Sequence, residues 1–366
     1  MSLLSGLLLS GIVLLSPALA SAEVVFQLVD ASPDQFGHTF ASINEHGQVA
    51  FRRNQGSSNA SILAWDPATQ SSTLIVSGSR LSARPTINNL GQVAYLNGVT
   101  SSTTQVEVWS PGSPTQVYFS GNDVPISGQP VINDSGLVAY ARLINNQFRI
   151  YTKASPTAIP SLVGEASSPL AVDINNSGDV ALFRNQEVFL NGESLTKDTG
   201  LRPNSNPILR DDGLVVFSGA LPGDFSDIFG VRAGEGPQVL ASAEDFGQLS
   251  SAGRSINNHG SLAFIGSVDG ISSLIFNGNP LLSVGDQLDG EEVTALSMGM
   301  QALNDSDQIA FKVEFNGTSS AIYVATVVPE PAMWMPLAML GMFGVWRRYR
   351  IPVHSRRSAC RSPENR

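Results

Sequence analysis

Cysteine is almost absent, since the only one in the 366 residues is Cys360. Residues 1–359 therefore have no disulfide, no thiolate nucleophile and no cysteine-based zinc site. Positive charge is also scarce: residues 1–346 contain 14 Lys and Arg against 30 Asp and Glu, a net charge of −16. A chain this acidic repels phosphate backbones, which excludes nucleic acid as a partner.

Residues 1–22 contain no charged side chain. This apolar stretch ends in small residues, as Ala18-Leu19-Ala20 and Ala20-Ser21-Ala22. The pattern predicts a signal peptide over 1–22, cleaved after Ala20 or Ala22, and therefore an exported protein. An uncleaved membrane anchor is the alternative.

The other end carries an uncharged run of 15 residues, Ala332–Trp346. It follows Pro329, Glu330 and Pro331, and Arg347 and Arg348 come directly after it. With Val327 and Val328 the stretch reaches the roughly 20 residues that a membrane helix needs. The arginines favour a cytoplasmic C-terminal side, so we expect a C-terminal membrane-anchor helix. The expected organisation is a signal peptide (1–22), one large domain (23–328), an anchor segment (329–350) and a basic tail (351–366).

One phrase recurs seven times in the central domain. Its first copy is Ile43-Asn-Glu-His-Gly-Gln-Val-Ala-Phe51, and later copies begin at 87, 132, 174, 209, 256 and 303. An apolar residue ends a strand, Asn-Asx-x makes a tight turn, and Gly in the left-handed conformation closes a hairpin. The turn positions are Asn44, Gly47, Asn88, Gly91, Asn133, Gly136, Asn175, Gly178, Gly213, Asn257, Gly260, Asn304 and Asp307.

Two further strand-like runs follow each copy, such as Ser61–Asp66 and Thr73–Ser77. Four short strands per ~45 residues is the size of a propeller blade. The seventh copy has only Ala321–Val328 after it, so its outermost strand is missing, and Val24–Val29 supplies a spare. We therefore predict an all-β, seven-bladed β-propeller of four-stranded blades, closed by the N-terminal strand. An open β-solenoid is the alternative.

Two family resemblances rest on these residues. The order Pro329-Glu330-Pro331, apolar stretch, Arg347-Arg348 resembles the PEP-CTERM sorting signal of Gram-negative bacteria, although Ile351–Arg366 continue beyond its usual end. That resemblance implies an exosortase-type processing enzyme as partner and a membrane-anchored state before processing, commonly in species that make exopolysaccharide. The repeats are similar to the Asn-x-x-Gly-x-x-Ala-Phe tandem family of exported proteins. That resemblance supports the fold and the location and leaves the activity open.

Candidate catalytic and metal-binding residues are few. His46 and His259 occupy a turn slot that Leu or Ser fills in other copies. The sequence marks no Ser-His-Asp arrangement around the other two histidines, His38 and His354, and His38 with a distant Ser and Asp is left open. Acidic pairs occur at Asp211-Asp212, Asp286 with Asp289, Glu291-Glu292 and Glu244-Asp245. They favour solvated turns, with a glycosidase pair or bound calcium as alternatives. We expect no cofactor and no metal ligands, with calcium left open.

Trp65, Trp109 and Tyr151 occupy equivalent strands and are expected to pack in the core, with sugar stacking as the alternative. No copy of the repeat is interrupted by a non-periodic polar cluster. The sequence therefore favours a non-catalytic surface or matrix protein that binds polysaccharide or other surface proteins. A polysaccharide hydrolase or lyase on a propeller scaffold is the alternative.

Overall fold

The computed structural model describes residues 23–34, 37–56, 59–82, 84–125, 127–247, 249, 253–316 and 319–328. Of the two units into which the chain divides, Phe26–Thr326 contains nearly all of the described residues. The predicted signal peptide, sorting motif, anchor helix and basic tail all lie outside the described residues. Within the described part, no helix is long and apolar enough to cross a membrane.

Seven antiparallel sheets make up the unit Phe26–Thr326, and we number them as blades in chain order. Blade 1 contains β2 (Ser42–Ile43), β3 (Val49–Gln55), β4 (Asn59–Asp66) and β5 (Ser71–Gly78), and blade 2 contains β6 (Thr86–Ile87), β7 (Val93–Gly98), β8 (Thr104–Ser110) and β9 (Ser113–Gly121). Blade 3 contains β10 (Val131–Ile132), β11 (Val138–Ile144), β12 (Gln147–Lys153) and β13 (Ser161–Ala166). Blade 4 contains β14 (Val172–Ile174), β15 (Val180–Arg184), β16 (Glu187–Leu190) and β17 (Glu193–Ser194).

Blades 5 to 7 follow the same plan with additions. Blade 5 contains β18 (Arg202–Pro203), β19 (Ile208–Leu209), β20 (Val215–Ala220), β21 (Asp227–Val231) and β22 (Gln238–Ala241), and the short helix α1 (Ala243–Phe246) comes next. Blade 6 contains β23 (Arg254–Ile256), β24 (Leu262–Val268), β25 (Ile271–Phe276) and β26 (Asn279–Ser283). Blade 7 contains β27 (Gln287–Leu288), β28 (Glu291–Leu303), β29 (Gln308–Phe315), β30 (Ser319–Val328) and β1 (Glu23–Ser32).

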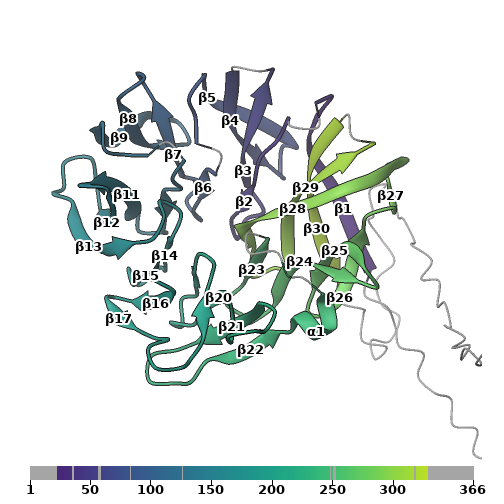
Figure 1. Ribbon diagram of the computed structural model, residues 1–366. Helices are drawn as coiled ribbons and strands as arrows, with labels where there is room; N and C mark the ends of the chain where they lie inside the picture. Colours follow the sequence, from purple (N-terminus) through teal and green to yellow (C-terminus); the bar gives the residue numbers. More distant parts are fainter. Residues whose placement is uncertain are drawn as a thin grey trace, which may run out of the picture. The chain divides into compact units, whose positions relative to one another are not determined.

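The blades are arranged in a ring, and short strands such as β2, β6, β14 and β23 lie nearest its centre (Figure 1). Blades 1 to 4 and blade 6 pair their strands in chain order from the centre outward. In blade 5, β18 and β19 both pair with β20, and in blade 7, β27 pairs with β28 while β1, the first strand of the chain, pairs with β30. The predicted seven-bladed, four-stranded propeller is therefore confirmed. The seventh sheet has the order β1-β30-β29-β28-β27. That β1 closes the ring energetically remains a prediction.

The core lies between neighbouring blades, because each repeat places its Val-Ala-Phe run on a strand packed on both faces. Val49, Ala50 and Phe51 are fully buried, and Phe51 packs in a cluster with Trp65 and with Ile322 of blade 7. A second cluster joins Tyr95 of blade 2 to blade 1 in the same way. Burying each such aromatic contributes about 1.5–3 kcal/mol, so the blades stabilise one another and not only themselves.

Candidate functional site

The turns of the seven repeats, six of which have Asn at the first position, lie at one face of the ring, which we call the turn face. In blade 1, Gly47 N donates to Asn44 O (3.0 Å), and Asn44 Oδ1 accepts from the backbone of His46 (3.1 Å) and Gln48 (2.9 Å). This side-chain cap fixes the turn locally, and Gly47 has a φ of +74°. The Asn oxygen is thus used within its own turn, whereas the amide nitrogen remains available for a neighbouring blade.

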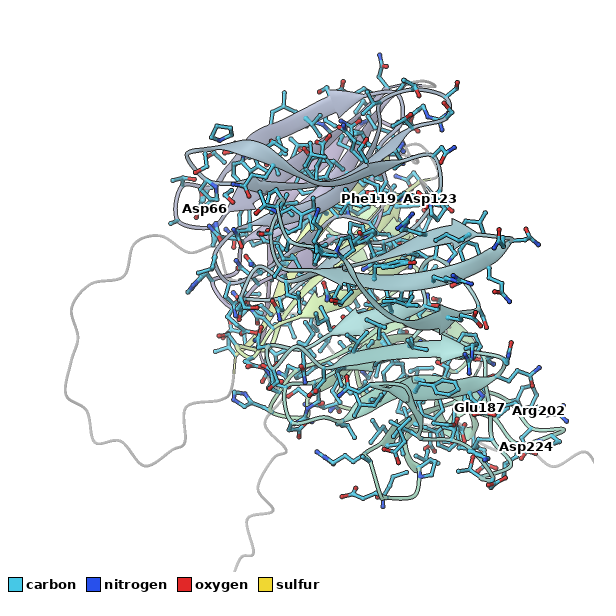
Figure 2. All side chains as sticks on the ribbon, turned by 90° about the vertical axis from the view of Figure 1, so that its left-hand side faces the viewer. Asp66, Phe119, Asp123, Glu187, Arg202 and Asp224 are labelled. Atoms are coloured by element: carbon cyan, nitrogen blue, oxygen red, sulfur yellow. The ribbon has the colours of Figure 1, made fainter. Side chains whose placement is uncertain are left out.

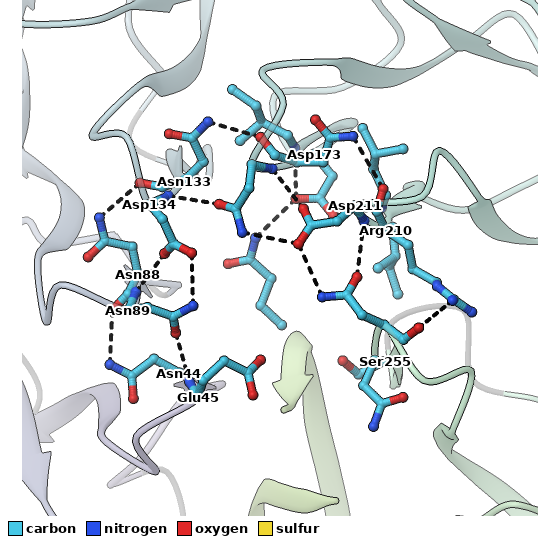
Figure 3. A pocket seen from close by; sticks show the side chains of 18 of the residues that line it. Asn44, Glu45, Asn88, Asn89, Asn133, Asp134, Asp173, Arg210, Asp211 and Ser255 are labelled. Carbon is cyan, nitrogen blue, oxygen red and sulfur yellow. Dashed lines mark hydrogen bonds between the residues drawn. The ribbon is translucent and has the colours of Figure 1, made fainter. Parts of the chain in front are cut away.

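The Asn amide nitrogens form the first of two hydrogen-bonded rings around the channel (Figure 3). Each Nδ2 donates to a backbone carbonyl oxygen of the next blade. The bonds run from Asn44 to Asn88 (2.9 Å), Asn88 to Asn133 (2.8 Å), Asn133 to Asn175 (2.9 Å), Asn175 to Arg210 (3.3 Å), Asn257 to Asn304 (3.0 Å) and Asn304 to Asn44 (2.9 Å). In blade 5, Arg210 stands in place of Asn and donates from Nη2 to the backbone oxygen of Asn258.

The residue after each turn position forms the second ring. Its backbone nitrogen donates to the side-chain oxygen of the equivalent residue in the next blade. The bonds run from Glu45 to Asn89 (2.8 Å), Asn89 to Asp134 (2.8 Å), Asp134 to Asn176 (2.9 Å), Asn176 to Asp211 (2.8 Å), Asp211 to Asn258 (3.0 Å), Asn258 to Asp305 (2.7 Å) and Asp305 to Glu45 (2.7 Å). Both rings are therefore continuous through all seven blades.

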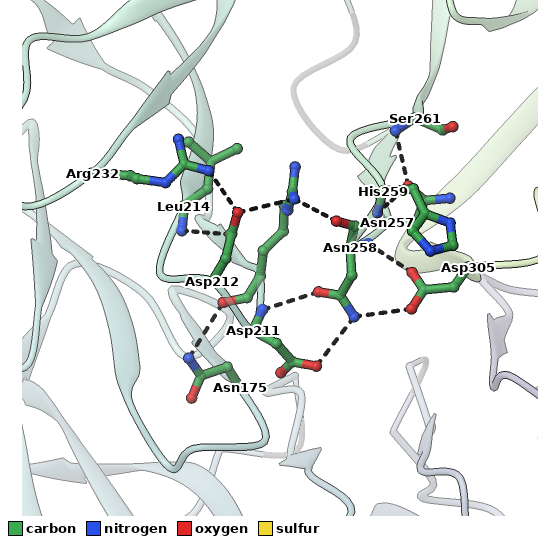
Figure 4. A network of polar contacts seen from close by, with 11 residues as sticks. Asn175, Asp211, Asp212, Leu214, Arg232, Asn257, Asn258, His259, Ser261 and Asp305 are labelled. Atoms are coloured by element: carbon green, nitrogen blue, oxygen red, sulfur yellow. Dashed lines mark hydrogen bonds and ion pairs between the residues drawn. The ribbon is translucent and has the colours of Figure 1, made fainter.

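Carboxylates in the second ring alternate with amides until blades 7 and 1, where Asp305 meets Glu45 directly. Burial raises the pKa of Glu45, and the negative charges of Asp305 and Asp134 act in the same direction, against the hydrogen bond from the Asp305 backbone. Amides elsewhere donate to the carboxylates: Asn258 Nδ2 lies 3.1 Å from both Asp211 Oδ2 and Asp305 Oδ2 (Figure 4). Asp211 and Asp305 thus share a neighbouring amide donor, whereas Glu45 lies next to the negative charge of Asp305.

One hydrogen bond crosses the central channel of the propeller below these two rings. Gln301, on β28 of blade 7, donates from Nε2 to Asp173 Oδ1 on β14 of blade 4 (3.0 Å). Asp173 also accepts from the backbone of Leu209 (2.8 Å) and Ile174 (3.0 Å). Burial raises the pKa of Asp173 to about 7 despite these three donors. The cavity that remains has a volume of about 140 Å³, whereas small-molecule pockets usually have ~300–1,000 Å³.

The acidic pairs singled out in the sequence do not converge. Asp211 belongs to the second ring, while Asp212 pairs with Arg210 (3.0 Å) and Arg232 (2.6 Å). Asp286 accepts from the backbone of Ser283 (2.7 Å) and Asp289 from the Tyr323 hydroxyl (2.8 Å). Glu244-Asp245 lie in the first turn of α1 and Glu291-Glu292 at the start of β28. Among the described residues, no three His, Cys, Asp or Glu side chains are grouped as metal ligands.

The structure brings together an Asp, a His and a Ser that the sequence could not pair. His38 Nε2 lies 2.9 Å from Asp30 Oδ2, and His38 Nδ1 lies 3.0 Å from Ser320 Oγ. Ser320 gives its one proton to the carbonyl oxygen of Asp34 (2.8 Å), so it does not donate to His38. In a catalytic triad the histidine accepts the serine proton. Ser320 is also 1% exposed and His38 2% exposed, and neither lines the channel cavity, so that cavity gives a substrate no route to them.

The other residues singled out in the sequence lie in exposed turns, in the core or outside the described residues. His46 and His259 are exposed in their turns, as the turn-slot interpretation predicts. Trp65 is 3% exposed, and Trp109 and Tyr151 pack against core clusters, so these three aromatics belong to the core. Pro329, Glu330, Pro331, Arg347 and Arg348 lie outside the described residues, as do Ala20, Ala22 and His354.

A second pocket, of about 880 Å³, lies between blades 5 and 6. It is lined by the β20–β21 and β24–β25 connections, and these are at the ends of the strands away from the Asn turns. Figure 2 shows Asp224, from the first connection, on the side of the propeller opposite to Asp66, whose carboxylate accepts from Gln48 Nε2 at the turn face (3.4 Å). The residues that line this pocket belong to no recognisable sequence motif, so the sequence by itself does not indicate the pocket.

Comparisons with known proteins bear on the tail and on the fold. Residues 327–350 match the model of the PEP-CTERM protein-sorting motif. This motif is the recognition signal for exosortase-type processing, and it indicates export with membrane-anchored sorting in Gram-negative bacteria. The search of curated proteins gave no match. The similarity of the repeats to the Asn-x-x-Gly-x-x-Ala-Phe family remains a prediction.

Solved structures similar to this chain include several enzymes. An oligogalacturonate lyase from Vibrio parahaemolyticus is 12% identical with a TM-score of 0.55, over 85% of this chain and 99% of that one. A virginiamycin B lyase from Staphylococcus aureus is 12% identical with a TM-score of 0.52, over 84% and 100%. TolB from Acinetobacter baumannii is 10% identical with a TM-score of 0.44, and this chain spans 64% of its length. At such identities the likeness concerns the fold alone.

Proposed function

We propose that this protein is an exported, non-catalytic propeller with a binding or structural role at the cell surface or in the extracellular matrix, linked to exopolysaccharide. Its signal peptide directs export, its C-terminal helix holds it in the membrane, and an exosortase-type enzyme processes it. Polysaccharide and other surface proteins are its proposed partners. The PEP-CTERM match at residues 327–350 supports the sorting part of this proposal.

One observation supports the non-catalytic part: the polar groups that converge on the channel are engaged with one another. The Asn and Asx side chains of the turns bond to the next blade, and Asp173 accepts three hydrogen bonds. Catalytic groups need a free face toward a substrate. These residues instead use their donors and acceptors to hold blades together, and so favour a rigid scaffold.

A polysaccharide lyase or hydrolase is the second candidate. Lyases with the same fold supply only an analogy, because a propeller supports many unrelated functions. His38 and Ser320 are buried beside the partly exposed Asp30, none of the three lines either pocket, and the channel cavity is small. The scaffold role is therefore the better-supported proposal.

The proposal is tested with the full chain in its native host. The change Glu330→Ala should leave export intact but block processing of the tail, and so reduce the surface yield, since Glu330 is the only charged residue between Glu314 and Arg347. Thr326→Ala, just upstream of the matched segment, is the control and should be processed normally. Unchanged mature size and surface yield for Glu330→Ala would overturn the sorting role.

The non-catalytic part needs a separate measurement. The processed protein is incubated with exopolysaccharide of the host, and the chain length and the number of new reducing or unsaturated ends are followed. We expect no change over a buffer control. Cleavage that persists in a highly purified preparation and scales with protein concentration would establish the enzyme instead.

A further inference from the structure

The pocket between blades 5 and 6 combines one exposed aromatic face with polar side chains. Phe225, in the β20–β21 connection, is 80% exposed. Buried Leu249 and Ile265 also line the pocket. A single exposed aromatic residue is not unusual by itself. Here, however, it stands at the rim of a pocket whose size falls within the range of ligand sites.

Most other residues of the pocket are hydroxyl, amide or glycine residues. Asn204 Nδ2 donates to Ser226 Oγ (2.6 Å), which leaves the Asn204 side-chain oxygen without a bond to any described residue. Ser267 and Ser272 also line the pocket, and their hydroxyls bond to no other described side chain or backbone group. Such groups both donate and accept hydrogen bonds, as the hydroxyls of a sugar do.

Ser218 supplies an independent observation. Its side chain is fully buried, lines this pocket, and its Oγ has no hydrogen-bond partner among the described residues. Buried polar atoms in native proteins are nearly always bonded, so an unpaired hydroxyl calls for a specific explanation. A polar group of a ligand seated in the pocket would provide the missing partner.

The charge of the pocket limits the class of ligand. Among the described residues that line it, Asp224 is the only ionisable one, and none is Lys or Arg. A carboxylate without a cation disfavours uronic acids and phosphorylated sugars. An aromatic face packs against the C–H face of a sugar ring.

We infer that the pocket between blades 5 and 6 binds neutral hexose units of a polysaccharide, with Phe225 stacking on the ring and Asn204, Ser218 and Ser267 bonding to its hydroxyls. This inference rests on the proposed binding role and gives that role a location and a ligand class. It does not require catalysis, because Asp224, the one carboxylate among the described residues of the pocket, has no second acid among them with which to form a catalytic pair.

The experiment uses the full chain in detergent and affinity electrophoresis in gels that contain a neutral glucan, mannan or galactan, with polygalacturonate as the anionic comparison. We expect retardation by at least one neutral polymer. Phe225→Ala should weaken that interaction on the order of 10-fold. Ile159→Ala, which truncates an 89% exposed side chain of blade 3, is the matched control and should bind normally.

Ser218→Ala adds a readout that separates ligand binding from structure. Removing an unpaired buried hydroxyl should not lower the melting temperature, but it should weaken binding about 2- to 10-fold. Equal binding by wild type, Phe225→Ala and Ser218→Ala would overturn the location while leaving a polysaccharide-binding role intact. Retardation by polygalacturonate alone would overturn the ligand class. Absence of any retardation would overturn the inference, whereas the processing and cleavage assays above decide the proposed function independently.

Discussion

Asn304 donates from Nδ2 to the backbone carbonyl oxygen of Asn44, 2.9 Å away, although 260 residues separate them in the chain. This bond joins blade 7 to blade 1 at the centre of the propeller. The bond from Asp305 N to Glu45 Oε2 (2.7 Å) joins the same two blades in the second ring. The blades that contain the first and the last copy of the repeat are therefore linked directly at the channel.

The first prediction concerns this link. Asn304→Ala removes the donor to Asn44 O, which keeps only its bond from Gly47 N, and it removes the side-chain cap of its own turn. We expect a loss of about 1–3 kcal/mol in the free energy of unfolding. Asn279→Ala is the control, since that amide is exposed and bonds only locally to Asn277 (3.2 Å). Chemical denaturation measures both, and equal small losses would show that the ring contributes nothing.

The second prediction concerns the left-handed turn position. Gly136 has a φ of +79°, and the nearest atom to an added Cβ is 3.6 Å away, so a substitution there reports backbone strain and not a clash. Gly136→Val should cost on the order of 1–3 kcal/mol. Gly136→Asp should cost less, because Asp307 occupies the equivalent position with a φ of +56°. Thermal unfolding of the two variants should give this order, and the reverse order would contradict the turn assignment.

The third prediction concerns pH. Burial raises the pKa of Asp173 to about 7 in the folded protein, whereas an unfolded Asp has a pKa of about 3.9. The folded state therefore retains a proton that the unfolded state loses. The resulting stability is fully present below pH ~4 and is lost as the pH rises through about 7. Asp173→Asn should flatten this dependence between pH 5 and pH 8.

Melting temperatures across that range test the Asp173 prediction. Asp224→Asn, at an exposed carboxylate, is the control and should keep the pH profile of the wild type. A wild-type protein whose stability rises from pH 5 to pH 8, or an Asp173→Asn variant with an unchanged slope, would refute the prediction.

The fourth prediction concerns the N-terminal strand. Deletion of residues 23–30 removes most of β1 and the Asp30 carboxylate that His38 contacts, and it uncovers the edge of β30. If β1 closes the ring, the domain should lose stability cooperatively and hydrogen-exchange protection should fall at 303–328. An open solenoid would instead lose protection only in the first repeat, at 31–77. Hydrogen exchange on the truncated chain distinguishes these results.

The sequence by itself determined the local turn and the number of blades. The hydrogen bonds that cap the Asn-Asx-x-Gly turn lie within five consecutive residues, since Asn44 Oδ1 accepts from the backbone of His46 and Gln48. The alternation of Val-Ala-Phe likewise specifies a strand without reference to distant residues. Seven copies of that signal therefore predicted seven blades, and the aromatic strands were correctly assigned to the core.

Only the tertiary structure decided which groups meet between blades. The amide of each turn Asn bonds to a residue 35 to 47 positions away, or 260 for Asn304, and nothing in the repeat marks its partner. Asp30, His38 and Ser320 meet because β1 and β30 are neighbours in one sheet. Phe225 and Ser267 meet where blades 5 and 6 pack side by side. Turn chemistry depends on neighbours along the chain and can be read from the sequence. Contacts across blades depend on how the sheets pack, which the repeat leaves open.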